Sequence, residues 1–301
     1  MNKNLIRAFA LLSSVFAIAH STAAMAQLNF TTYQYGTSTI TTITGIRGDN
    51  MTGNFSTGSG GNTGGLLFGL SNGAIVAGNI SPFPTATANQ SNYPGAISST
   101  PYGPNFGSST GILRVVGSYK TTASNPNDLG YLFDAAAAPG QQLTTLFAPA
   151  GGGDTTLNTL AHSNFGNQVV GNYDTILATG NAFIYDISTG TYTTNNKPGA
   201  LSTTAYGVYG NRIAGGYADT PTTLRGYIYN ENTQVFTTYN APGGTLVTHF
   251  EGITSGGQAN TYNLVADSVD LNGNAHAWAV HVDSAGLATW TEIAVPGASV
   301  T

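Results

Sequence analysis

The stretch Ala200–Gly243, ALSTTAYGVYGNRIAGGYADTPTTLRGYIYNENTQVFTTYNAPG, reads as one complete copy of a unit that recurs through the chain. It holds a short apolar-Gly segment (AYGV), an apolar-x-Gly-polar-aromatic segment (IAGGY), a segment with alternating aromatics (GYIY) and an aromatic-Thr-Thr segment before Pro-Gly. Each is short and bounded by Gly, Asn, Asp or Pro, which is typical of antiparallel strands joined by tight turns. The unit therefore predicts four strands.

Relatives of this unit lie on both sides of it, and each ends at a proline. The prolines recur with a period of about fifty residues, at Pro94, Pro149, Pro198, Pro242 and Pro296. The units span approximately residues 37–95, 96–150, 151–199, 200–243 and 244–297. Four short strands per unit predict an all-β fold, a β-propeller of about five four-stranded antiparallel blades. A non-closed array, a β-solenoid or two sandwiches, is the alternative, which unequal units with hairpin-type tips disfavour.

An extra copy of the fourth segment precedes the first unit, because Phe30–Tyr33 (FTTY) repeats Phe236–Tyr239 (FTTY). Residues 27–36 therefore predict a strand that closes the ring by joining the last blade. The last unit also has a fourth strand of its own at Thr289–Ile293, so 27–36 is alternatively a surplus strand.

The N-terminus has the pattern of a secretory signal peptide. Lys3 and Arg7 precede an apolar run from Ala8 to Ala19, and an A-x-A cleavage pattern ends at Ala26. The run is shorter than the ~20 residues that a membrane span needs. We expect residues 1–26 to be removed, residues 27–301 to form one repeat domain, and the protein to be extracellular or periplasmic. Membrane contact is then expected only through the signal peptide before cleavage.

The composition excludes several classes of partner and site. The chain has 8 Lys and Arg residues against 13 Asp and Glu residues, so it lacks the excess of cationic side chains that nucleic-acid binding needs. Cysteine is absent, which excludes disulfides, thiol catalysis and thiolate metal sites. Charged residues make up only 7% of the chain, yet aromatic and β-branched residues are plentiful, so we expect a folded β-protein and not disorder.

Gly273–Trp278 (GNAHAW), preceded by a "GI … VADS" segment, resembles the short HAF-type repeats of bacterial extracellular proteins. The resemblance covers the last unit, and the other units share only their VVGNY-like and FIYD-like strands. It implies a secreted protein with a propeller-like fold, and it transfers no chemistry.

A candidate site lies on the predicted inner strands. Glu251 is the only carboxylate at a position where the other units have Thr44, Tyr102, Ala161 and Tyr206. Five-bladed hydrolases need two or three converging carboxylates, so a lone Glu251 is only a candidate catalyst. A glutamate with two histidines could hold a metal, but this spacing matches no known ligand set. The predicted binding residues are His249, Glu251, His162, Tyr206 and Tyr102.

The loop at Asp270, Asn272 and Asn274 has oxygen ligands at alternate positions, like the start of a calcium loop. It lacks the downstream bidentate glutamate and coincides with an Asn-Gly hairpin tip, which favours an ordinary turn. No catalytic or phosphate-binding motif is present, and no cofactor is predicted.

One aromatic residue recurs in the second strand of four units, and two readings of this row stay open. Repeat architectures bury a face between neighbours, which predicts an inter-blade core, whereas a ring of sugar-stacking platforms is the alternative. The residues are Phe55, Tyr119, Tyr173 and Tyr217.

These observations predict a secreted or surface-attached, non-enzymatic β-propeller that acts as a binding or structural module, with an extracellular glycan or surface protein as partner. An extracellular carbohydrate-active hydrolase that uses Glu251 is one alternative, and a second carboxylate within ~5–9.5 Å of it would favour that function. A passive matrix or surface-layer component is the other.

Overall fold

The computed structural model describes residues 32–58, 64–71, 74–79, 95–106 and 112–294. Contacts join the residues from Tyr33 onward into one unit. The predicted signal peptide lies outside the described residues, as do residues 27–31 of the predicted extra strand. Residues 32–36 are described and form no strand. Within the part of the chain that the structure describes, no helix is long and apolar enough to span a bilayer.

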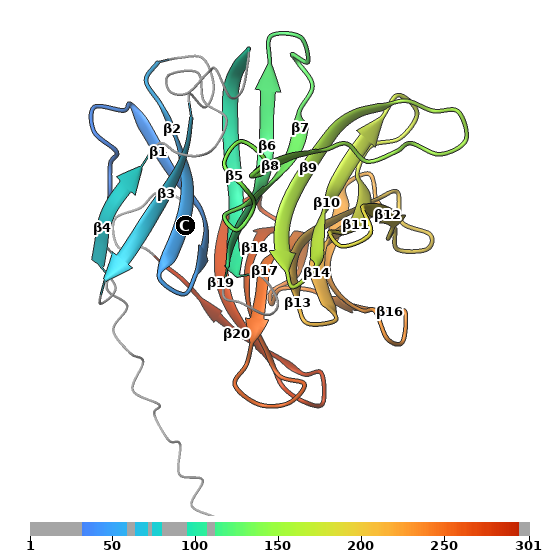
Figure 1. Cartoon of the computed structure of the whole chain (residues 1–301). Helices are drawn as coiled ribbons and strands as arrows, with labels where there is room; N and C mark the ends of the chain where they lie inside the picture. The colour runs from blue at the N-terminus through green and yellow to red at the C-terminus, as the bar shows by residue number, and fades with distance from the viewer. Residues whose placement is uncertain (1–31, 59–63, 72–73, 80–94, 107–111, 295–301) are drawn as a thin grey trace, which may run out of the picture. The chain divides into compact units, whose positions relative to one another are not determined.

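Five four-stranded sheets follow one another along the chain (Figure 1). In each sheet the strands lie side by side in chain order, and neighbouring strands are antiparallel. The first blade comprises β1 (Ile40–Arg47), β2 (Asn50–Ser56), β3 (Gly64–Ser71) and β4 (Ala74–Asn79). The second comprises β5 (Ala96–Phe106), β6 (Leu113–Thr121), β7 (Leu129–Asp134) and β8 (Leu143–Leu146).

The third blade comprises β9 (Thr156–Phe165), β10 (Gln168–Thr175), β11 (Asn181–Asp186) and β12 (Thr191–Thr194). The fourth comprises β13 (Ser202–Tyr209), β14 (Arg212–Thr220), β15 (Thr223–Asn230) and β16 (Val235–Tyr239). The fifth comprises β17 (Thr245–Ser255), β18 (Tyr262–Asp270), β19 (Ala275–Val282) and β20 (Ala288–Glu292). The predicted β-propeller of five four-stranded antiparallel blades is confirmed.

The glycine of the apolar-x-Gly-polar-aromatic strand is required by a close approach of two strands. In the third blade, a Cβ added at Gly171 would overlap the carbonyl oxygen of Leu160 on β9 and lie 2.9 Å from the Phe183 ring on β11. No side chain fits between these groups. The glycine of the motif is therefore explained by the close packing of the first and second strands of a blade.

The aromatic residue of the same motif belongs to the core, as the first of the two readings predicts. Phe55, Tyr119, Tyr173 and Tyr217 are each between 3% and 8% exposed. The tyrosine hydroxyls also explain the Thr-Thr signature of the fourth strand. Tyr173 pairs with the hydroxyl of Thr194 at 3.0 Å, and the second and fourth blades repeat this contact. The repeated tyrosines are therefore buried and satisfied.

Apolar clusters join blades that are consecutive in the chain. Three of them link the second to the third, the third to the fourth and the fourth to the fifth blade. A fourth cluster links the second blade to Leu67 of the first. The other face of the first blade, with Phe55 and Phe68, packs against Tyr33 and Tyr35. The segment before β1 therefore covers a blade face.

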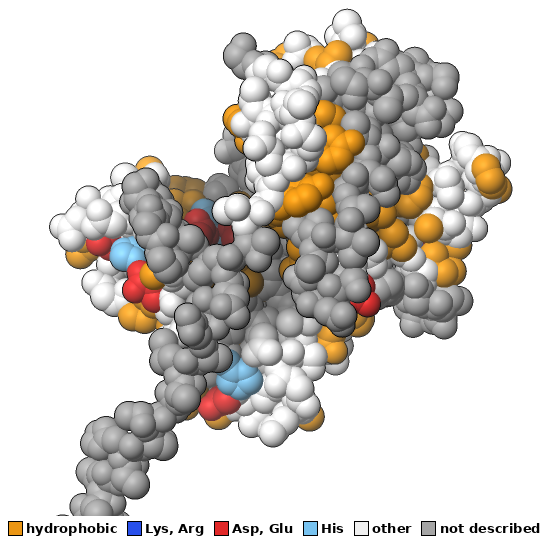
Figure 2. Space-filling model, turned by 90° about the vertical axis from the view of Figure 1, so that its left-hand side faces the viewer, with side chains coloured by type: hydrophobic (Ala, Val, Ile, Leu, Met, Phe, Trp, Pro, Cys, Tyr) orange, Lys and Arg blue, Asp and Glu red, His pale blue; other side chains and the backbone are white. Residues whose placement is uncertain are grey.

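Exposed charge is sparse on the face of the molecule shown in Figure 2, where acidic and histidine side chains lie in small groups among apolar and uncharged ones. This agrees with a chain in which charged residues make up 7%.

Candidate functional site

The first strand of every blade carries a β-bulge at the same place. In the fourth blade the register with β14 shifts between Ala205 and Gly207, so Tyr206 is the extra residue. The corresponding shifts in the other four blades define the equivalent bulged residues. The five bulged residues are Thr44, Tyr102, His162, Tyr206 and Glu251.

This register corrects one sequence prediction. The alignment of units placed Ala161 in the inner row, but Ala161 pairs with Gly171 and Ser163 with Val170, so the bulged residue between them is His162. Ala161 is fully buried in an inter-blade cluster. The reason is that a bulge shifts the register by one residue and so changes which side chain points inward.

All five bulged residues line one pocket with a volume of about 760 Å³. Residues from the inner strand of every blade contribute to its wall, together with Val265 of β18 and Ala279 of β19. The volume is within the range of pockets that hold small molecules. The repeated bulge therefore creates a shared site, because it turns one side chain per blade out of the ladder and into the same space.

The aromatic side chains of this pocket form a continuous row. Ring centroids are 4.7 Å apart between Tyr102 and His162, and 4.9 Å apart between His162 and Tyr206. The row continues to His249, whose ring centroid lies 5.8 Å from that of Tyr206. Four predicted binding residues, one from each of the second to the fifth blades, therefore meet in this row.

Polar groups of the blades hold these rings in place. Nε2 of His162 lies 2.8 Å from Oδ1 of Asn172, and the hydroxyls of Tyr102 and Tyr206 have side-chain hydrogen bonds to Ser118 and Thr204. Burial lowers the pKa of His162 to about 4, so its imidazole is neutral near pH 7. Burial, together with the carboxylates of Glu251 and Asp267, raises the pKa of Tyr206 to about 12.

Asp267 joins the predicted residues at the end of this row, and sequence reasoning missed it. It lies opposite His249 in the β17–β18 ladder. Nδ1 of His249 lies 3.7 Å from Oδ1 of Asp267 and 4.0 Å from Oε1 of Glu251. Asp267 stands at the fourth motif position, where Asn172 stands in the third blade. A polar residue recurring there was the available signal.

The two carboxyl groups share one environment. Burial, and then the adjacent Asp267 carboxylate, raise the pKa of Glu251 above its usual value. Burial lowers the pKa of His249, although Asp267 opposes that shift. Because two carboxylates this close repel when both are ionised, a proton is retained between them more readily than on an isolated glutamate.

His249 lies over a glycine of the neighbouring blade. A Cβ added at Gly216 on β14 would overlap Cδ2 of the imidazole and lie 3.1 Å from Nε2. The second strands of the other blades carry a side chain at this motif position. The missing side chain in the fourth blade therefore provides the space that His249 occupies.

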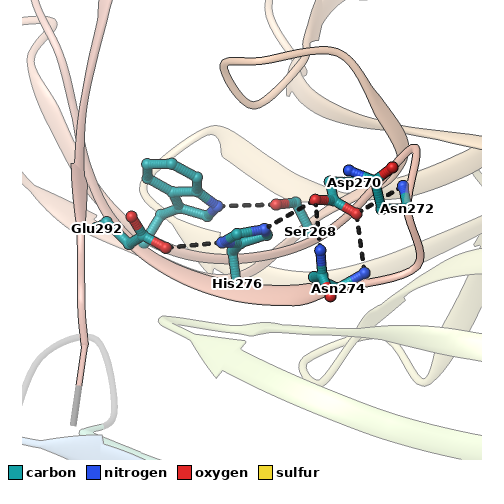
Figure 3. A network of polar contacts seen from close by, with 7 residues as sticks. Ser268, Asp270, Asn272, Asn274, His276 and Glu292 are labelled. Carbon is teal, nitrogen blue, oxygen red and sulfur yellow. Dashed lines mark hydrogen bonds and ion pairs between the residues drawn. The ribbon is translucent and has the colours of Figure 1, made fainter. Parts of the chain in front are cut away.

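The predicted calcium residues do not line the pocket; they lie in the turn shown in Figure 3. Oδ1 of Asp270 accepts hydrogen bonds from the backbone N–H groups of Asn272 and Asn274, each at 2.8 Å. Oδ2 accepts from the side chain of Asn274 at 2.9 Å. His276 pairs with Glu292 through Nδ1 at 2.7 Å and faces Asp270 at 3.7 Å. Both oxygens of Asp270 thus serve the hairpin turn that the sequence also predicted here.

No family model and no curated protein matches the chain. Solved structures resemble it at low identity. A prolyl endopeptidase has a TM-score of 0.45 and 12% identity, and the match covers 82% of this chain and 34% of the endopeptidase chain. A post-proline cleaving enzyme from Rickettsia typhi has a TM-score of 0.41 and 9% identity over 88% and 38%.

The SapL1 lectin, solved with alpha methyl fucoside, has a TM-score of 0.44 and 11% identity over 83% of this chain and 78% of its own. This chain therefore spans about a third of the two peptidase chains and most of the lectin chain. At such identities the likeness concerns the fold.

Proposed function

We propose that this protein is a secreted, non-enzymatic binding module that takes a small neutral glycan into the pocket formed by the five bulged residues. The observation that carries the proposal is the row of Tyr102, His162 and Tyr206, which ends at the carboxyl of Glu251 in one pocket. A matrix role would not require such a pocket.

The chemistry of the wall suits a sugar. Aromatic rings stack against the apolar face of a pyranose, and carboxylates and hydroxyls bind its hydroxyl groups. Arg47 and Glu251 both line the pocket, so its described wall carries no cluster of cations for an anionic ligand. A neutral ligand therefore fits better than an anionic one.

Binding is tested by calorimetric titration of neutral mono- and oligosaccharides chosen from a glycan array. Tyr206→Ala is expected to weaken binding at least tenfold, because it removes the central stacking surface. Phe147→Ala is the matched control, since Phe147 is an aromatic residue that is 47% exposed and does not line the pocket. Absence of any array signal, or equal affinity of Tyr206→Ala and wild type, would contradict the proposal.

Hydrolysis of a glycan is a second candidate function, because Asp267 supplies a second carboxylate beside Glu251. The offered atoms of His249, Glu251 and Asp267 all lie within 4.8 Å of one another, and a side-chain hydrogen bond joins the two carboxyls. Catalytic pairs in retaining glycosidases are about 5–5.5 Å apart and flank the scissile bond. The shorter separation of the Glu251 and Asp267 carboxyls favours binding over hydrolysis.

Turnover separates the two functions. Under the binding proposal, the array ligands are recovered intact after incubation with the wild-type protein. Cleavage that is lost in both Glu251→Gln and Asp267→Asn, with binding retained, would replace the binding module by the hydrolase.

A further inference from the structure

We propose that His249, Glu251 and Asp267 bind a divalent transition-metal ion, with Zn²⁺ as the best-suited metal, in a cluster of which Glu251 lines the pocket. This inference goes beyond glycan binding and does not depend on it. The residues come from the inner strand β17 and the adjacent strand β18 of the fifth blade.

The three side chains converge through one ligand atom each. Nδ1 of His249 is 3.7 Å from Oδ1 of Asp267 and 4.0 Å from Oε1 of Glu251. All three offered atoms lie within 4.8 Å of one another. Tetrahedral Zn²⁺ with bonds of about 2.0–2.2 Å holds its ligand atoms about 3.4 Å apart. Side-chain rotations that bring each atom inward by less than about 1 Å would therefore complete the site.

The hydrogen bond that joins the carboxyls of Glu251 and Asp267 needs a shared proton, which a bound cation would replace. Oδ1 of Asp267 is buried and has no hydrogen-bond partner among the described residues. The separations of 3.7 and 4.0 Å are too long for hydrogen bonds from His249. A buried acceptor without a donor is costly, and a cation between the three groups would satisfy it.

The fold also fixes the imidazole. His249 lies in the space left by Gly216 of the fourth blade, and its side chain is 19% exposed. The Tyr206 ring covers it from the pocket side at a centroid distance of 5.8 Å. The ring is thus held from two directions with Nδ1 toward the carboxyls. Preorganised ligands of this kind favour metal binding.

The ligand set selects the class of metal. One imidazole nitrogen with carboxylate oxygens suits Zn²⁺ and its neighbours, whereas Ca²⁺ takes six to eight oxygen ligands. Three protein ligands leave at least one coordination position for water or another molecule, as in open zinc sites. Glu251 lines the pocket, so this position would face it.

The test is a calorimetric titration of the purified, chelator-treated protein with ZnCl₂ alone, and with CaCl₂ for comparison. We expect one saturable Zn²⁺ site, weakened at least tenfold in His249→Ala and in Asp267→Asn. Circular dichroism checks that each variant is folded.

Gly216→Ala tests the geometry without removing a ligand. The added methyl group displaces the imidazole, so Zn²⁺ affinity is expected to fall at least tenfold. Gly69→Ala is its control, because nothing lies within 4 Å of the added Cβ. His276→Ala controls for adventitious binding, since His276 also faces two carboxylates, of Asp270 and Glu292.

A direct readout is the imidazole ¹⁵N spectrum, in which Zn²⁺ should shift Nδ1 of His249 and leave His276 unchanged. Absence of saturable Zn²⁺ binding, or binding that His276→Ala abolishes while His249→Ala and Asp267→Asn retain it, would overturn the proposal.

Discussion

Asp267 lies directly opposite His249 across the β17–β18 ladder, with Oδ1 3.7 Å from Nδ1 of the imidazole. Opposite residues in an antiparallel pair project to the same face, so the pairing of these two strands brings the aspartate beside the imidazole. Together with the bulged Glu251, this one cross-strand pair distinguishes the fifth blade from the other four.

The packing of the first two strands of a blade is tested by Gly171→Ala. The added Cβ overlaps the Leu160 carbonyl and presses on Phe183, so the free energy of unfolding should fall by about 1–3 kcal/mol. Urea denaturation measures the change. Gly69→Ala, which meets open space, should stay within about 0.5 kcal/mol of wild type. Equal stability of the two variants would contradict this account of the motif.

The buried His162 predicts a loss of stability in acid. Its folded pKa, about 4, is below the ordinary 6.5, so between these values the unfolded chain binds a proton that the folded chain does not. The part of the folding stability that depends on a neutral His162 is fully present above pH 6.5 and decreases as the pH falls toward 4. From pH 7.5 to 4.5, wild type should lose up to about 2 kcal/mol more than His162→Gln.

Urea denaturation of both proteins at the two pH values measures this difference. His276 serves as a control of opposite sign, because Glu292 and then Asp270 raise its pKa. Its contribution is present in acid and is lost as pH rises through its folded pKa. A pH dependence that is identical in wild type and His162→Gln would show that the imidazole is not the group responsible.

The packing of the segment before β1 on the first blade is tested by replacing Tyr33 and Tyr35. Tyr33 and Tyr35 contact Phe68 and Phe55, each with ring centroids 5.0 Å apart. Tyr33→Ala with Tyr35→Ala should speed amide hydrogen exchange in β2 and β3, corresponding to about 1–3 kcal/mol of local stability. Amides of β10 and β14 are the internal control. Uniform acceleration across all blades would argue against a local cover.

A cation at the end of β1 links distant blades. The Arg47 guanidinium lies 5.4 Å from the ring centroid of Phe165 on β9 and 5.5 Å from that of Tyr209 on β13. Arg47→Met keeps the aliphatic stem and should cost about 0.5–2 kcal/mol in thermal or urea unfolding.

Arg225→Met is the matched control for that substitution. Arg225 pairs with Asp219 at an exposed position, where ion pairs contribute about 0–1 kcal/mol. If the two variants lose the same stability, the contact of Arg47 with the two rings makes no special contribution.

The fold could be predicted from the amino-acid sequence, because the signals that specify it are local. Strand length, alternating aromatics and turn residues at Asn-Gly and Pro-Gly repeat in each unit, and each unit forms one sheet. The inter-blade role of Tyr119, Tyr173 and Tyr217 could also be predicted, since a repeat must bury the face that meets its neighbour, whereas Phe55 packs against the segment before β1. Tyr102, Tyr206 and Glu251 could be assigned to the inner strands because they stand at equivalent positions of the repeated unit.

The side chains that complete the pocket could not be predicted, because their positions depend on contacts between strands and between blades. A bulge moves the inward position by one residue, so His162 and not Ala161 faces the other blades. Asp267 reaches His249 through strand pairing, and the space for the imidazole comes from Gly216 in another blade. Such contacts depend on strand register and on the packing of blades. The residue types and spacing within a single strand do not specify either of them.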